Sequence, residues 1–213
     1  MPRIISAFLT LLALSPVLLS GCGASNTATN AIPPASPVSS STQPSPISEI
    51  VASEPPVAPE KNPPGDIPDT QVFVTYSSQS GGYKLKVPEG WARQTHGKNV
   101  SFINKLDGVK VEIAPSATAA TAKTQQVAQL KKSGRAVKIL NVKDVKLPSG
   151  PAVVVEYTSN SEPEPVTGKQ VRLENNNYLF FNHGKLAILR LWAPQGADNV
   201  DQWQLISRSF RWL

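Results

Sequence analysis

From about residue 83 onward, hydrophobic and polar residues alternate in short runs, which is the pattern of half-buried β-strands. Residues 83–87 (YKLKV) show it clearly, with lysines between apolar positions. Strands are predicted for residues 83–87, 100–103, 109–113, 137–147, 152–158, 169–174, 178–181 and 186–192. Turns are predicted between them at 88–91, 107–108, 148–151, 175–177 and 183–184, where Gly, Pro, Asn and Asp gather.

Two stretches carry the spacing of an amphipathic helix instead. The first covers residues 119–133, where Val127 and Leu130 share a face and the lysines at 131–132 suit the C-terminal end of the helix dipole. Gly134 can end this helix. The second follows Asp198 near the end of the chain. Its apolar positions are Val200, Trp203, Ile206 and Phe210.

These elements predict an α+β fold with a central, largely antiparallel sheet of about six or seven strands. One helix is inserted early and one lies at the end. Residues 153–155 and 186–192 are apolar on both faces of their strands, so both faces of the sheet are expected to be covered. This favours a layered sandwich over an open sheet.

The N-terminus has the features of an export signal. Residues 4–19 (IISAFLTLLALSPVLL) follow Arg3 and are too short and too interrupted by proline for a membrane span of roughly 20 residues. The run ends in Leu19, Ser20, Gly21 and Cys22, the only cysteine of the chain. These four residues resemble the lipobox of bacterial lipoproteins. The resemblance implies cleavage before Cys22 and a diacylglycerol on its sulfur; an ordinary signal peptide that contains a cysteine is the alternative.

After Cys22 the composition shifts to Ser, Thr, Ala, Asn and Pro, and 11 of the 20 prolines lie between Pro33 and Pro68. Such a segment has too little apolar surface to offset the entropy of ordering, so it is expected to be a disordered tether. The predicted organisation is a signal peptide at 1–21, the lipidated cysteine and tether at 22–70, and one folded domain at 71–213.

Charge is divided unevenly between these parts. Residues 22–70 carry one basic and five acidic residues, whereas residues 71–213 carry 19 basic and 10 acidic residues, a net charge of +9. A basic domain can associate with anionic headgroups or envelope polymers, although the same charge also serves ordinary solubility. Nucleic acid is a poor candidate, because the lysines are scattered and are not clustered with aromatic residues.

Several short segments resemble the PsbP-like (Mog1/PsbP fold) domains. The first is the strand and turn at 82–91 (GYKLKVPEGW); the others are 166–169, 196–203 and 209–212, which resemble bacterial lipoproteins that carry this domain. The resemblance covers roughly residues 75–213 and implies an α-β-α sandwich with a central antiparallel sheet. In the family this fold supports photosystem II or binds a small GTPase, and many bacterial members have no assigned role. Because fold does not carry function with it, only the architecture is transferred.

The candidate chemistry is sparse. One cysteine and two histidines cannot form a Cys/His zinc site, and no serine lies in a G-x-S-x-G elbow. His183 is expected in a hairpin turn, and His96 lies in a loop where it could act only beside a partner. Glu162 and Glu164 could offer oxygen ligands to a hard cation but are more typical of a solvated connection.

The remaining motifs are also interpreted as structural. The Gly168–Lys169 pair lacks the rest of a phosphate loop, and Gly81 and Gly82 precede a strand, so they offer no helix N-terminus to an anion. Core and edge packing is expected for the four tryptophans. If two of them converged on a groove, a ligand site would become plausible. They are Trp91, Trp192, Trp203 and Trp212.

We therefore expect a lipoprotein held at the extracytoplasmic face of the cell membrane through acylated Cys22. Its PsbP-like domain is expected to be a non-catalytic binding or accessory module for an envelope protein or an anionic envelope polymer, with no cofactor and no metal. The alternatives are a hydrolase-type enzyme with a cryptic site, a photosystem-associated subunit in a photosynthetic host, and a passive envelope constituent. A deep pocket that placed His96 or His183 beside a carboxylate would favour the enzyme.

Overall fold

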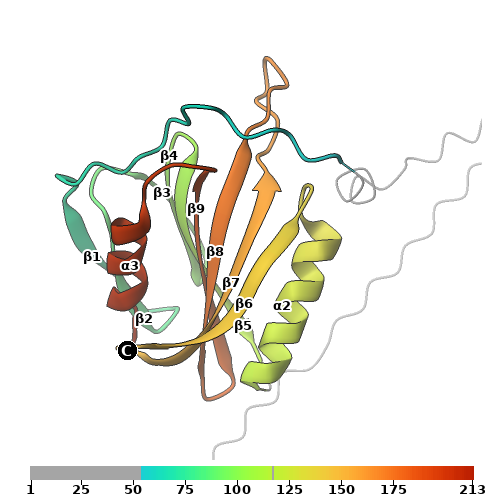
Figure 1. Cartoon of the computed structure of the whole chain (residues 1–213). Helices are drawn as coiled ribbons and strands as arrows, with labels where there is room; N and C mark the ends of the chain where they lie inside the picture. Colours follow the sequence, from blue (N-terminus) through green and yellow to red (C-terminus); the bar gives the residue numbers. More distant parts are fainter. Residues whose placement is uncertain (1–53, 117) are drawn as a thin grey trace, which may run out of the picture. The chain divides into compact units, whose positions relative to one another are not determined.

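The computed structural model describes residues 54–116 and 118–213 (Figure 1). The expected signal peptide, its recognition residues Leu19, Ser20 and Gly21, the lipidation site Cys22 and most of the expected tether lie outside the described residues. Among the described residues, no helix combines the length and the apolar character needed to cross a membrane.

A seven-stranded antiparallel sheet forms the centre of the domain. Its strand order is β3-β4-β5-β9-β8-β7-β6. The strands are β3 (Ala92–His96), β4 (Asn99–Asn104), β5 (Asp107–Pro115), β6 (Lys138–Leu147), β7 (Gly150–Asn160), β8 (Arg172–Asn182) and β9 (Lys185–Pro194). The α+β class with a central antiparallel sheet is therefore confirmed.

One face of this sheet is covered by helix α3 (Val200–Ser209) and a small sheet of order β1-β2-β10 (Figure 1). Its strands are β1 (Phe73–Ser78), β2 (Tyr83–Pro88) and β10 (Arg211–Trp212). Phe210, at the end of α3, is fully buried and stacks on Phe180 of β8 at 4.1 Å between ring centroids. Tyr83 of β2 stacks on the ring of Phe210 at 5.9 Å between centroids. These aromatic contacts join the three elements into the larger core.

Helix α2 (Ala119–Ser133) covers the opposite face, beside β6 and β7 (Figure 1). Thr118 caps its N-terminus by accepting the backbone N–H of Thr121 at 3.1 Å, and the N–H of Gly134 donates to Leu130 at its C-terminus. Its buried face meets the smaller core around Val155 and Tyr157 of β7. Both faces of the sheet are covered, as the apolar strands predict.

The predicted hairpin between β4 and β5 forms, but its turn is shifted. Asp107 and Gly108 pair within the β4–β5 ladder, and the turn is made by Lys105, at φ 55°, and Leu106. Gly108 is needed for another reason: a Cβ at this position would collide with the indole ring of Trp192 on β9. The glycine provides close packing here, not turn geometry.

The asparagines at 175–177 were expected to form a turn, and this prediction is wrong. They lie in the middle of β8, and two of them are buried. Asn175 accepts from Arg190 of β9 at 2.7 Å and donates to Ser159 of β7 at 3.0 Å. Hydrogen bonds to both neighbouring strands therefore stabilise an extended segment whose local sequence favours a turn.

Residues 54–70 were assigned to the disordered tether, but they pack along the top of the domain (Figure 1). We call them the strap. Ile67 is 4% exposed and belongs to the larger core. Glu54 pairs with Arg135 at 2.7 Å, and the side chain of Asn199 binds the strap at both the N–H of Ile67 and the carbonyl of Gly65. The ordered domain thus begins well before residue 71.

Candidate binding groove

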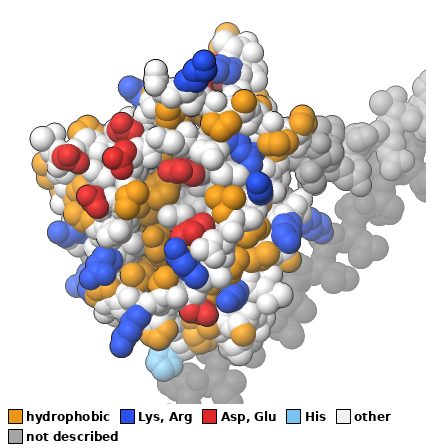
Figure 2. Space-filling model, viewed as in Figure 1, with side chains coloured by type: hydrophobic (Ala, Val, Ile, Leu, Met, Phe, Trp, Pro, Cys, Tyr) orange, Lys and Arg blue, Asp and Glu red, His pale blue; other side chains and the backbone are white. Residues whose placement is uncertain are grey.

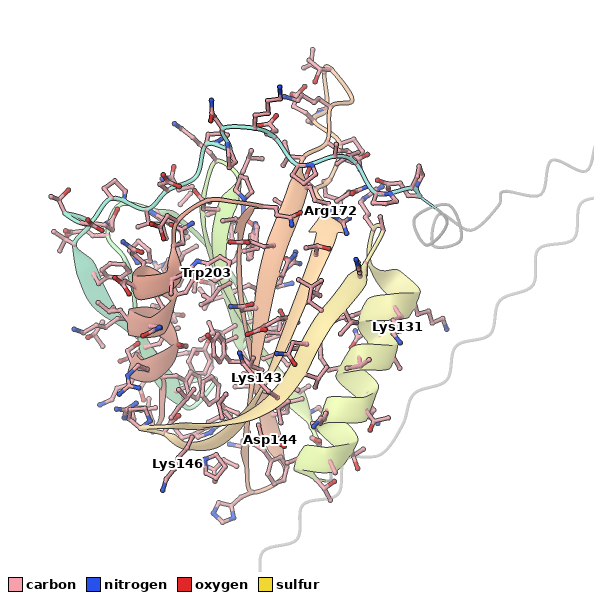
Figure 3. All side chains as sticks on the ribbon, viewed as in Figure 1. Lys131, Lys143, Asp144, Lys146, Arg172 and Trp203 are labelled. Carbon is pink, nitrogen blue, oxygen red and sulfur yellow. The ribbon has the colours of Figure 1, made fainter. Side chains whose placement is uncertain are left out.

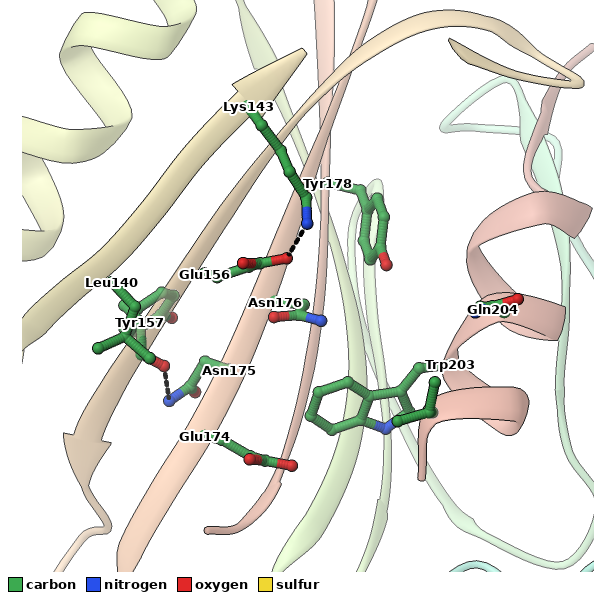
Figure 4. Close-up of a pocket in the computed structure, with 11 residues that line it drawn as sticks. Leu140, Lys143, Glu156, Tyr157, Glu174, Asn175, Asn176, Tyr178, Trp203 and Gln204 are labelled. Atoms are coloured by element: carbon green, nitrogen blue, oxygen red, sulfur yellow. Dashed lines mark hydrogen bonds and ion pairs between the residues drawn. The ribbon is translucent and has the colours of Figure 1, made fainter. Parts of the chain in front are cut away.

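A cavity of about 450 Å³ lies between α3 and strands β6, β7 and β8 (Figure 4). It continues into a second cavity of about 460 Å³ lined by residues of β6, β7, β8 and the later part of α3. The two share Lys143, Glu156, Tyr178 and Gln204, and we call the combined feature the α3 groove. The other lining residues are Leu140, Val145, Lys146, Leu147, Val154, Tyr157, Glu174, Asn175, Asn176, Val200, Trp203, Ser207 and Arg208.

The period of a strand explains how polar side chains come to line this groove. Alternate residues point to the same face of a sheet, so Glu174, Asn176 and Tyr178 of β8 share the face beneath α3. Glu156 of β7 lies opposite Asn176 in the strand register. Trp203 extends from α3 towards these residues and completes the groove on the helix side (Figures 3 and 4).

The electrostatics differ between the two halves of the groove. In the upper half, Lys143 pairs with Glu156 at 2.6 Å. Burial raises the pKa of the Glu174 carboxyl, whereas the hydrogen bond donated to it by the backbone N–H of Gly196 partly lowers this pKa. In the lower half, Lys146 and Arg208 are exposed and ion-pair with no carboxylate among the described residues. The upper half of the groove therefore has two carboxyl groups and one cation, whereas the lower half has two cations without ion-pair partners among the described residues. Figure 2, viewed as in Figure 1, shows basic, acidic and apolar side chains mixed over this face.

A neighbouring cavity of about 580 Å³ lies beneath the strap and shares Leu140 with the groove. It is lined by Arg172, which is 6% exposed. The guanidinium of Arg172 donates to the carbonyl of Ala136 and to Oδ1 of Asn160, both at 2.9 Å. Burial lowers the pKa of the Arg172 guanidinium, and these two hydrogen bonds, together with one to Oγ1 of Thr158, satisfy its buried donors.

The candidate residues from the sequence do not meet in this groove. His96 ends β3 and is exposed, and His183 is an exposed turn residue at φ 44° between β8 and β9. Glu162 pairs with Arg135 at 2.9 Å, whereas Glu164 accepts from the backbone and hydroxyl of Thr167. The structure therefore uses the two carboxylates separately, and no group of three or more metal-binding side chains occurs in the part of the chain that is described.

The glycine motifs and tryptophans have structural positions. Gly82 lies in the β1–β2 turn at φ 72°, and Lys169 pairs with Glu60 of the strap at 2.6 Å. Trp91 and Trp212 pack against the larger core, while Trp192 lies under Arg190 at 4.9 Å. Of the four tryptophans, Trp203 lines the α3 groove.

Sequence reasoning missed the polar floor of the groove. Glu174 was placed in a predicted strand and Asn176 in a predicted turn. The prediction therefore did not show that the two residues lie on the same face of one strand. No local signal marks this face, because residues 174–177 are all polar and do not alternate with apolar residues. Lys143 and Glu156 fell on predicted strands joined by the predicted turn at 148–151, but the register that brings the two side chains together is not visible in the sequence.

No family model matches the chain, and no curated protein matches it. Among solved structures it is similar to cyanobacterial PsbP (CyanoP) from Synechocystis sp. PCC 6803, at 17% identity and a TM-score of 0.47 over 70% of this chain and 99% of that one. It is also similar to a Bacteroides thetaiotaomicron VPI-5482 protein, at 9% identity and a TM-score of 0.46 over 65% of this chain and 48% of that one. A third is a Pseudomonas aeruginosa protein of unknown function, PA94, at 14% identity and a TM-score of 0.41 over 64% of this chain and 94% of that one.

These similarities are weak in both sequence and superposition. The architecture described above follows from the strand pairing and helix packing of this chain itself.

Proposed function

We propose that this chain is a lipid-anchored accessory protein at the extracytoplasmic face of the cell membrane, whose PsbP-like domain binds an anionic envelope polymer in the α3 groove without catalysing a reaction. The anchor is supported by the lipobox-like sequence that ends at Cys22. Two acyl chains hold a protein on a bilayer stably, whereas one holds it only marginally.

The observation that carries the binding proposal is the basic end of the groove. Lys146 and Arg208 project there without ion-pair partners among the described residues, beside the aromatic ring of Tyr178. An elongated anionic chain can neutralise these cations while its uncharged parts contact Val145, Leu147 and Val154, which line the same half of the groove. An open groove suits a polymer better than a small, fully enclosed ligand.

The hydrolase alternative required a pocket that placed a histidine beside a carboxylate. His96 and His183 are both exposed at hairpin ends, and neither lines the α3 groove. The specific observations therefore favour binding over hydrolysis.

The groove is tested with inorganic polyphosphate as the probe and neutral dextran as the uncharged comparison. The double variant Lys146→Glu/Arg208→Glu should reduce polyphosphate affinity at least tenfold, because two attractive charges become repulsive. The matched control Lys84→Glu/Lys86→Glu makes the same change in net charge on exposed positions of β2. Equal losses in the two double variants would show that net charge alone is responsible, and would contradict binding in the groove.

The anchor is tested separately in cells. Cys22→Ala should abolish incorporation of radiolabelled palmitate and release the protein from the membrane fraction. Palmitate labelling that survives in this variant would contradict lipidation at Cys22, whatever the groove binds.

A further inference from the structure

Asp107, the first residue of β5, has a buried carboxylate oxygen without a partner. Its side chain is 5% exposed, and Oδ1 makes no hydrogen bond with any described residue. A buried polar atom is nearly always hydrogen-bonded in a folded protein, because leaving it unpaired costs its lost hydration. This oxygen therefore calls for an explanation.

Asp107 lines a small cavity of about 140 Å³ between the β4–β5 turn and the strap. Gly65 of the strap passes so close that a Cβ there would lie 2.7 Å from Oδ1 of Asp107, and its φ of 126° is open only to glycine. The strap backbone is thus held directly over the unpaired oxygen.

A second carboxylate lines the same cavity. Asp66 follows Gly65 on the strap, and its Oδ1 accepts the backbone N–H of Asp198 at 2.8 Å. The side chain of Asn104 adds an amide, and the one basic residue among the lining residues is Lys105. The cavity therefore presents oxygen ligands from two segments that are far apart in sequence.

We propose that Asp107 and Asp66 bind a hard divalent cation, preferentially Ca²⁺, that clips the strap onto the β4–β5 turn. Ca²⁺ takes six to eight oxygen ligands in flexible geometry, and carboxylates, carbonyls and water all serve. Two carboxylates match its charge, and the cavity also has room for water ligands. The described residues that line the cavity include no histidine or cysteine, the ligands that would favour a softer metal.

The electrostatics of Asp107 agree with this assignment. Burial, reinforced by the charge of Asp66, raises the pKa of the Asp107 carboxyl to about 7, and Lys105 opposes the shift only partly. The two carboxylates at this cavity therefore repel each other unless Asp107 is protonated or a cation lies between them.

The site is tested on the full-length protein in detergent, by the shift in thermal midpoint between a chelator and added CaCl₂ at constant ionic strength. The wild-type midpoint should rise and saturate with Ca²⁺, and equilibrium dialysis with radioactive calcium should show one site. Asp107→Asn should abolish both effects. In chelator this variant should be at least as stable as the wild type, because an amide removes the charge that burial disfavours.

The matched control is Asp144→Asn, which changes a carboxylate whose side chain is 81% exposed and should leave the calcium response intact. Asp66→Asn provides a second test if the change at Asp107 prevents folding, because Asp66 is exposed and an asparagine can still accept the N–H of Asp198. It should weaken calcium binding at least tenfold. A wild-type midpoint that does not respond to Ca²⁺, or a response that persists in Asp107→Asn, would overturn the proposal and leave Asp107 as a buried protonated acid.

Discussion

Glu174 combines a packing position with a place in the α3 groove. It lies near the start of β8, where burial raises its pKa while the N–H of Gly196 donates to it. Its neighbour across the groove is Trp203 of α3, which is 7% exposed (Figure 4). A buried carboxyl group stays protonated to a higher pH than a solvated one, because burial disfavours the charged form. Folding is therefore linked to proton uptake by Glu174.

The linkage gives a pH prediction. Between the ordinary pKa of a glutamate and the raised value, the folded protein binds more protons than the unfolded chain. The contribution of Glu174 is therefore fully present below the ordinary pKa and decreases as pH rises through the raised one. Glu174→Gln should remove this component and flatten the corresponding part of the profile, as measured by urea denaturation at a series of pH values. Glu89→Gln, at an exposed turn position, is the control, and an unchanged profile in Glu174→Gln would contradict the assignment.

At the scale of elements, the strap is the part of the structure that changes the expected domain most. It crosses the top of the sheet and inserts Ile67 into the larger core. It also makes polar contacts that join separate elements, including Glu60 with Lys169 and Asp69 with Gln202 of α3 at 3.1 Å. A segment with many prolines loses little chain entropy on ordering, because proline is already restricted.

Ile67 should therefore contribute to stability as a core residue. Ile67→Ala is expected to lower the free energy of unfolding by about 3 kcal/mol, from lost burial and the cavity left behind. Val74→Ala on β1 removes atoms from a side chain that is 40% exposed and should change it by less than about 0.5 kcal/mol. Denaturant unfolding of both variants measures these changes in the free energy of unfolding. Equal effects would mean that the strap does not belong to the cooperative unit.

The elements show which features a sequence can predict. The bounds of α2 follow from its sequence alone, because the apolar spacing, Lys131, Lys132 and Gly134 are all local signals. Strand β8 was divided by its asparagines because their partners, Ser159 and Arg190, lie 15 or 16 residues away along the chain. The strap was missed because its average composition conceals one inserted residue, Ile67. In the groove, the helical spacing of Trp203 was visible, while the pairing that brings Glu156 opposite Asn176 was not.

On the scale of the whole molecule, the excess of basic residues in the domain determines its long-range attraction for anions. The region from residue 71 to 213 carries a net charge of +9, so an anionic polymer is attracted before it reaches any particular side chain. The binding affinity contributed by the α3 groove depends on local geometry, whereas this long-range attraction depends on the total charge of the domain.

The salt dependence of polyphosphate binding separates the affinity due to the α3 groove from the attraction due to total charge. Raising the NaCl concentration should weaken polyphosphate binding by the wild type progressively, because ions screen exposed charges within about 10 Å at 0.1 M. Lys146→Glu/Arg208→Glu should bind more weakly at every salt concentration and with a shallower dependence on salt, since fewer cations take part. Parallel salt curves for wild type and variant, measured by fluorescence anisotropy of labelled polyphosphate, would assign the binding to total charge alone.

The double hydrogen bond from Asn199 to the strap has a mechanical consequence. Asn199 precedes the first turn of α3, and its side chain clasps the backbone at Gly65 and at Ile67. A pulling force on the chain ahead of Glu54 reaches Arg135 and Asn160 first, then Lys169, and then this clasp. Peeling in that order loads the end of β7, where Asn160 pairs with Arg172, before it loads α3, one wall of the α3 groove.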